Sequence, residues 1–187
     1  GFVYAGLTNT MPKLLETGLS ASLDMSYTQI GIYVGLVSGL ASFSSILGGW
    51  MADRYSARTI YIVFWLLQVP LLFIIVSLSG ATLLFALLMV MCFLLSFAAA
   101  ENMLVAYYTP FRWRAVAYGA KFVLALGVGG LTVHLAGSLF DRDGDFALLF
   151  MLFGGAAILA AAAAFLLPQS RPRIAAGAGP AVTPGAG

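Results

Sequence analysis

Two charged side chains of opposite sign, Glu101 and Lys121, stand inside stretches that are otherwise apolar, and they are the strongest candidates for chemistry in this sequence. A charge within a membrane costs about 2.5–3.5 kcal/mol on insertion scales and normally faces a cavity or a partner. At a rise of 1.5 Å per residue, both lie roughly 10 Å inside the same boundary of their stretches. We therefore predict a Glu101–Lys121 pair, which is either a structural ion pair or a functional unit. Alternatively, both side chains extend to the membrane surface.

Three further polar residues within apolar stretches are candidates for a functional role. Asn102 adds a hydrogen-bond donor and an acceptor beside Glu101. His134 is either a hydrogen-bonded structural residue or a proton carrier. Asn9 precedes Pro12, and polar side chains before a helix-distorting proline either line a pathway or mark a helix end that meets water.

The composition excludes several classes of protein. Of the 187 residues, 61% are apolar and 9% are charged, whereas soluble domains carry about 25% charged residues. A net charge of +2 without a basic run gives no support for nucleic acid binding. Cys92 is the single cysteine, no metal or cofactor motif is present, and residues 141–145 indicate a solvated turn rather than a calcium loop.

The elements that must position the candidate residues are helices long enough to cross a bilayer, which takes roughly 20 apolar residues. Five such stretches are predicted at 28–50, 59–79, 82–108, 115–140 and 146–167. Residues 1–15 resemble the outer part of a sixth helix, and because the chain starts at Gly1 inside an apolar stretch, we expect a fragment of a longer protein. The prediction is an all-α membrane protein, an antiparallel bundle of six transmembrane helices over 1–167. A Pro-, Gly- and Ala-rich disordered tail is predicted at 168–187.

Arginines predict the orientation of this bundle. One side collects most of them, namely Arg54, Arg58, Arg112, Arg114, Arg171 and Arg173. The other side has Arg142, with Lys13 nearby. Because cytoplasmic loops carry the excess of Lys and Arg, the first side and the C-terminus are predicted to be cytoplasmic.

Small residues form stripes on two of the predicted helices. The first stripe lies within an arc of roughly 120° and comprises Gly31, Gly35, Gly39, Ser42, Ser45 and Gly49. The second lies within about 20° and comprises Gly119, Gly130 and Gly137. Such stripes allow close approach of two helix backbones, so we predict helix–helix seams there, either static or moving.

Two loops carry a family resemblance. Residues 49–58 (GWMADRYSAR) resemble the G-x-x-x-D-R-x-x-x-R signature that the major facilitator superfamily places between transmembrane helices. The run Pro110-x-Arg112-x-Arg114, followed by Gly119, is similar to the loop between helices ten and eleven of that family. Tyr107 stands where sugar porters carry a glutamate, which argues against a sugar porter.

The resemblance implies that residues 1–167 form helices seven to twelve of a twelve-helix transporter that works by alternating access. The missing N-terminal six-helix half would then be its partner. The signature residues Gly49, Asp53, Arg54 and Arg58 would hold the cytoplasmic gate. The solute pathway would be lined by the intramembrane polar residues, Asn9, Glu101, Asn102, Lys121 and His134.

The sequence as a whole favours a secondary transporter that moves a small organic solute across a plasma membrane, of a bacterial inner-membrane type, with protons as the candidate coupling ion. One alternative is a membrane receptor or scaffold that keeps the fold without transporting. Another is an intramembrane enzyme, although no converging nucleophile and base is visible in the sequence.

Overall fold

A computed structural model describes residues 2–19 and 26–166. Within these ranges the chain forms six α-helices and two short 3-10 helices. Their bounds are α1 Phe2–Leu19, α2 Tyr27–Arg54, α3 Ala57–Ile74, η1 Ile75–Ser77, α4 Gly80–Tyr108, η2 Phe111–Trp113, α5 Arg114–Asp143 and α6 Ala147–Phe165. The predicted all-helical class is therefore confirmed for the described residues, while the tail predicted at 168–187 lies outside them.

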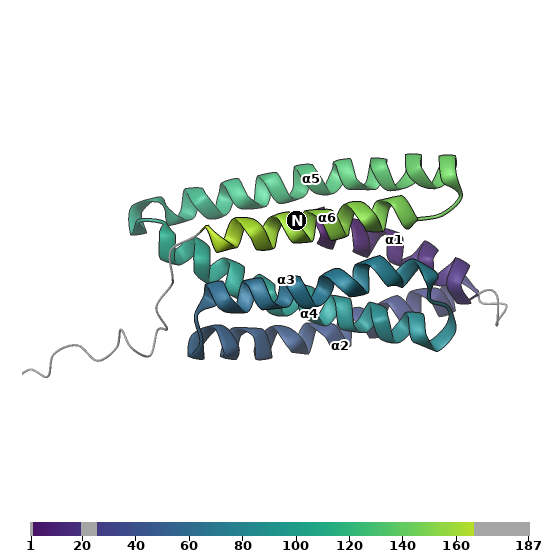
Figure 1. The fold of residues 1–187 in the computed structure, drawn as a ribbon, viewed down its shortest axis with the longest axis horizontal. Helices are drawn as coiled ribbons and strands as arrows, with labels where there is room; N and C mark the ends of the chain where they lie inside the picture. Colours follow the sequence, from purple (N-terminus) through teal and green to yellow (C-terminus); the bar gives the residue numbers. More distant parts are fainter. Residues whose placement is uncertain (1, 20–25, 167–187) are drawn as a thin grey trace, which may run out of the picture.

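The helices run along the long axis of the molecule, and consecutive helices from α2 to α6 are joined at alternating ends (Figure 1). The most extensive pairing is between α2 and α4, followed by α3 with α6 and with α4. In contrast, α5 packs mainly on α1, which begins about halfway along the bundle (Figure 1). The helix that carries Lys121 is thus attached to the bundle mostly through one short neighbour.

Five segments are long and apolar enough to span a membrane, and they coincide with the five predicted stretches. They are Tyr27–Arg54, Ala57–Ser77, Gly80–Tyr108, Phe111–Arg142 and Ala147–Phe165. The shorter α1 is not among them. Its lower apolarity reflects polar residues that include the exposed ion pair Lys13–Glu16, with 3.0 Å between Nζ and Oε2.

The predicted connections after α1, α2 and α5 were too long, because these helices continue into them. Helix α1 includes Pro12 and extends to Leu19 instead of residue 15, and α2 extends to Arg54 instead of residue 50. Asp141 to Asp143 belong to the last turn of α5, which ends at Gly144 with a φ of +74°. In a bilayer, every backbone group left outside a helix needs another partner, so long helices with tight turns are favoured over longer loops.

Helices α2 and α4 approach each other closely. Ser44 Oγ donates to the carbonyl of Cys92 at 2.8 Å, and Ser96 Oγ donates back to the carbonyl of Ser44 at 2.9 Å. At Gly48 there is no room for a side chain, because a Cβ would overlap the backbone of Ser96 and lie 2.5 Å from its Cα. Small side chains and two reciprocal hydrogen bonds therefore fix this crossing.

The stripe predicted as a seam on α2 is not the face that packs. A Cβ on Gly31, Gly35, Gly39 or Gly49 would meet no neighbouring atom within 4 Å in the described chain. The buried face is instead the one that carries Gly48. The prediction was wrong as an intrachain seam because α2 also presents apolar side chains all around, so the sequence did not identify the packed face.

The same correction applies to α5. Gly119, Gly130 and Gly137 are exposed, with no neighbour within 4 Å among the described residues. The packed face carries Gly129, where a Cβ would lie 3.1 Å from Ala5, and Thr132, which is fully buried. Both α2 and α5 thus pack through one small-residue face and leave another uncovered.

Candidate functional site

The predicted pair of intramembrane charges is present. Lys121 Nζ lies 3.3 Å from Glu101 Oε1, and the two side chains are 22% and 31% exposed. The same Nζ donates to Asn102 Oδ1 at 2.6 Å. The ammonium group therefore has two acceptors from adjacent positions of α4, and the prediction that the two charges meet is confirmed.

Tyr118, which was not among the predicted site residues, completes this polar cluster. Its hydroxyl donates to the backbone carbonyl of Asn102 at 2.6 Å. Tyr118 and Lys121 are three residues apart on α5 and thus share one face of the helix. Since α4 and α5 otherwise touch little, these hydrogen bonds are the main direct link between them.

A cavity of about 590 Å³ opens beside the ion pair. It is lined by Phe2, Glu101, Val105, Thr109, Ala117, Ala120, Lys121, Leu124, Ala125 and Val128. The wall is thus apolar except for Thr109 and the two charged side chains. Such a wall, with few polar groups at defined points, is typical of a small-molecule site.

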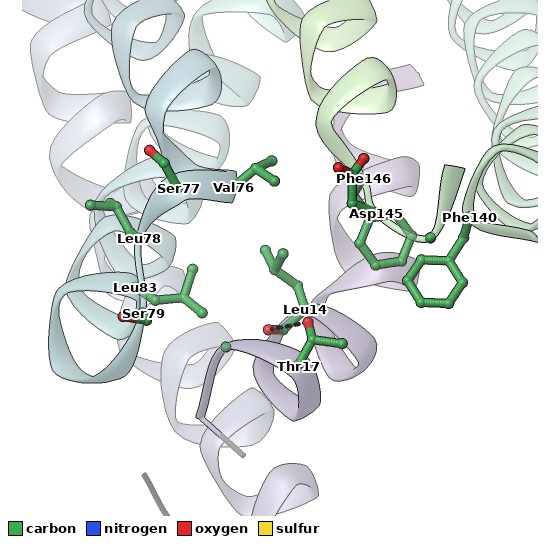
Figure 2. A pocket seen from close by; sticks show the side chains of 12 residues that line it. Leu14, Thr17, Val76, Ser77, Leu78, Ser79, Leu83, Phe140, Asp145 and Phe146 are labelled. Carbon is green, nitrogen blue, oxygen red and sulfur yellow. Dashed lines mark hydrogen bonds between the residues drawn. The ribbon is translucent and has the colours of Figure 1, made fainter. Parts of the chain in front are cut away.

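A second cavity, of about 300 Å³, lies at the other end of the bundle (Figure 2). Side chains from the end of α1, from η1 and from the α5–α6 turn converge on it, among them Leu14, Val76 and Phe146 (Figure 2). Thr17 donates there to the carbonyl of Leu14 at 3.2 Å. None of the predicted site residues lines this cavity, so it does not contribute to the candidate site.

The residues of the predicted gating loop lie at the α2–α3 connection. Asp53 and Arg54 are exposed, and the guanidinium of Arg54 lies 5.5 Å from the centre of the Trp50 ring. Asp53 has no ion-pair partner among the described residues. Asp53 at the end of α2 opposes the negative end of the helix dipole, so a cationic partner would stabilise it. Arg58, Arg112 and Arg114 do not pair with it within residues 2–19 and 26–166.

Arg58 makes a different contact. Its Nε donates to the carbonyl of Ala164 at 3.0 Å, and its Nη2 donates to the carbonyl of Phe165 at 2.6 Å. These carbonyls belong to the last turn of α6, where helix carbonyls lack their usual i+4 amide donors. Arg58 at the start of α3 therefore caps the end of α6 and joins the two helices.

We predict that Arg58→Gln loosens the end of α6 and lowers the free energy of unfolding by about 1–2 kcal/mol, because two charge-assisted hydrogen bonds are lost. Hydrogen–deuterium exchange should increase in the last turn of α6. Arg54→Gln is the matched control, since it removes the same charge one helix earlier without touching α6. Equal exchange in wild type and Arg58→Gln would contradict the capping role.

The second family-like loop connects α4 to α5. The carbonyl of Pro110 accepts a hydrogen bond from the Trp113 amide at 2.9 Å, which closes the 3-10 turn η2. Arg112 and Arg114 are exposed and project from this turn. The α2–α3 and α4–α5 connections lie at the same end of the bundle (Figure 1), so the arginines of the described chain gather there as predicted, while Arg142 lies at the other end.

Asn9 and His134 lie apart from the cluster. Asn9 is exposed and donates from its amide to the carbonyl of Ala5 on its own helix at 2.7 Å. His134 is exposed and has no hydrogen-bond partner in the described chain, so the structural hydrogen bond considered for it is not formed there. Neither residue lines the cavity beside Glu101.

Gln68 on α3 is a buried polar residue that was not among the predicted site residues. It is fully buried, and neither atom of its amide has a hydrogen-bond partner among the described residues. The buried ring nitrogen of Trp65, three residues earlier, also has no hydrogen-bond partner among the described residues. The signal was available in the spacing, because Tyr61, Trp65, Gln68 and Leu72 recur every three to four residues and so face one side of α3.

Five helices that can cross a bilayer, together with an ion pair inside two of them, define a multi-pass membrane protein. The chain matches the family model of the Major Facilitator Superfamily over residues 1–183, and it therefore belongs to this family of membrane transporters. The comparison with curated proteins found no match.

Proposed function

We propose that this protein is a secondary active transporter that moves a small organic solute by alternating access. The observation that carries the proposal is the Glu101–Lys121 ion pair, which lies within two membrane spans beside an otherwise apolar cavity of about 590 Å³. Charged side chains at such depth are costly and occur mainly along substrate and ion pathways. Membership of the transporter family supports the same conclusion.

Protons are the proposed coupling ion, and Glu101 is the proposed carrier. Protonation of Glu101 would remove the negative charge that faces Lys121, while Asn102 Oδ1, at 2.6 Å, would keep the ammonium group in place. The released ammonium face could then bind a polar group of the solute. This competition would link the proton to the solute, because each changes the affinity for the other by the same factor.

We further propose that a second six-helix half covers the open faces of α2 and α5, as in a twelve-helix transporter. Glycines without any neighbour in the described chain mark both faces, for example Gly35 on α2 and Gly130 on α5. Small residues on one face of a membrane-spanning helix favour close packing with another helix. The complete protein would reside in a plasma membrane of bacterial inner-membrane type, with the arginine-rich end cytoplasmic.

Asp53 is proposed to hold the cytoplasmic gate by pairing with a cationic or helix-end partner in that second half. Asp53→Asn keeps the shape and removes the charge, so we expect changed inward and outward populations with little change in folding. Spin-label distances across the cytoplasmic side of the full-length protein test this. Distance distributions that match those of the wild type would argue against a gating role.

The transport function is tested in proteoliposomes that contain the full-length protein and a pH-sensitive dye. Solutes from a panel of small organic anions, cations and neutral compounds are added to one side, and solute-dependent proton movement is recorded. We expect saturable movement with one class and none with Glu101→Gln. Chain 1–187 expressed alone should show no saturable uptake. Solute binding without any flux would instead indicate a receptor or scaffold and would overturn the proposal.

A further inference from the structure

The connection between α4 and α5 exposes aromatic rings next to arginines. We call it the basic–aromatic loop, and it comprises Tyr107, Tyr108, Phe111, Arg112, Trp113 and Arg114. Phe111 is 85% exposed and Trp113 is 52% exposed. Rings exposed to this extent at the end of two membrane spans lie where the headgroup region of a bilayer would be, which is the depth that aromatic side chains prefer.

No acidic side chain of the described chain forms an ion pair with this loop. Neither Arg112 nor Arg114 has an acidic partner in the part of the chain that the structure describes. The sequence contains no Asp or Glu between Glu101 and Asp141, and Glu101 already pairs with Lys121. The two arginines of the loop therefore carry positive charges with which no acidic side chain of the described chain forms an ion pair.

Both guanidinium groups lie against rings of the same loop. Arg112 is 5.7 Å from the centre of the Trp113 ring, and Arg114 is 5.6 Å from the centre of the Phe111 ring. Arg114 also donates from Nε to the carbonyl of Thr109 at 3.3 Å. Contact with a ring restrains a guanidinium group while its N–H edge remains able to bind phosphate in a bidentate manner.

We propose that the basic–aromatic loop binds the phosphate of anionic phospholipids in the leaflet at this end of the bundle. The arginines supply the charge-assisted donors for phosphate, and the exposed rings supply the apolar contact with the glycerol and upper acyl region. A free phosphate ion would use the arginines alone and would leave the Phe111 ring in water. Since α5 touches α4 little beyond the polar cluster, the lipid also restrains the start of α5.

The test uses the full-length protein in nanodiscs of phosphatidylcholine, alone or mixed in equal parts with phosphatidylglycerol, and native mass spectrometry counts the retained lipids. Wild type should retain phosphatidylglycerol at least tenfold more strongly than phosphatidylcholine. The double variant Arg112→Gln/Arg114→Gln should lose this preference, since each arginine near an anionic surface contributes a factor of about five. Arg142→Gln, at the opposite end of the bundle, is the matched control and should keep it.

Equal retention of both lipids by the wild type would overturn the proposal, and this comparison requires no variant to fold. An unchanged preference in the double variant, or the same loss in Arg142→Gln, would also overturn it and would favour a protein partner for the loop. Inorganic phosphate added in excess separates the two sources of the ligand. If the exposed rings contribute to lipid binding, inorganic phosphate should leave the retention of phosphatidylglycerol unchanged. If the loop recognises only a phosphate ion, inorganic phosphate should displace the lipid fully, which would contradict the proposal.

Discussion

Lys121→Met should destabilise the protein more than Glu101→Gln, although the two residues form one ion pair. Loss of the lysine leaves the Glu101 carboxylate without the cation 3.3 Å away, and we expect a loss of about 2–4 kcal/mol in the free energy of unfolding. In Glu101→Gln, the ammonium group keeps Asn102 Oδ1 at 2.6 Å, so about 1–2 kcal/mol is expected. The two losses differ because Lys121 has a second hydrogen-bond partner, Asn102 Oδ1, in addition to Glu101.

The double variant Glu101→Gln/Lys121→Met should regain most of the lost stability, because removing both charges leaves neither unpaired. Wild type, the two single variants and the double variant form a double-mutant cycle. Thermal unfolding in detergent and the folded yield are measured for all four proteins. Strictly additive losses would show that the two side chains do not interact in the folded protein. The matched control is Lys13→Met, which breaks an exposed ion pair at 3.0 Å and should cost less than about 1 kcal/mol.

Transport separates the structural role of this pair from a coupling role. If the pair is only structural, the double variant should recover flux together with stability. If Glu101 carries the proton, flux driven by a pH gradient should remain absent in the double variant. Solute exchange should then persist in Glu101→Gln, which keeps Lys121.

Gly48→Ala should be the most disruptive glycine substitution in α2. The added Cβ would overlap the backbone of Ser96, which cannot move aside as a flexible side chain can. We expect the α2–α4 crossing to open and the free energy of unfolding to fall by about 1–3 kcal/mol, as for overpacked cores. The reciprocal hydrogen bonds between Ser44 and α4 should weaken with it.

Gly155→Ala in α6 is the matched control, because a Cβ there meets nothing within 4 Å in the described chain. That substitution should be neutral or slightly stabilising, since alanine favours a helix over glycine by up to about 1 kcal/mol. A cysteine cross-link between α2 and α4, formed in wild type and reduced in Gly48→Ala, measures the crossing directly. Equal unfolding temperatures for the two variants would contradict the close approach.

The Glu101–Lys121 pair could be predicted because the depth of a residue in the membrane depends only on its position along the helix axis. Both residues stand at similar distances from one short loop, and a helix rises by a constant amount per residue. The spans could be predicted for a related reason, since a bilayer requires a minimum apolar length. Neither the prediction of the ion pair nor that of the spans depends on which neighbouring helix a given helix face contacts.

The packed faces could not be predicted in this way. In α2 and α5, glycines occur on more than one side and apolar side chains surround the helix, so the contrast between a buried and an exposed face is absent. The predicted seams contain Gly49 and Gly119, whereas in the structure Gly48 and Gly129 lie at the helix contacts. In lipid, burial brings little hydrophobic gain, and the fit of backbones decides the contact.

The sequence by itself determined the membrane class, the number of long spans, the end at which the arginines of the loops gather, and the meeting of Glu101 with Lys121. Each of these depends on composition or on position along a helix axis. Only the tertiary structure decided that Asn102 and Tyr118 join the pair, that Arg58 caps α6, and that Gly48 marks the close approach of α2 to α4. These contacts depend on the rotation of each helix about its own axis and on partners distant in the chain, and an apolar helix with no polar side leaves that rotation undetermined until its neighbours are in place.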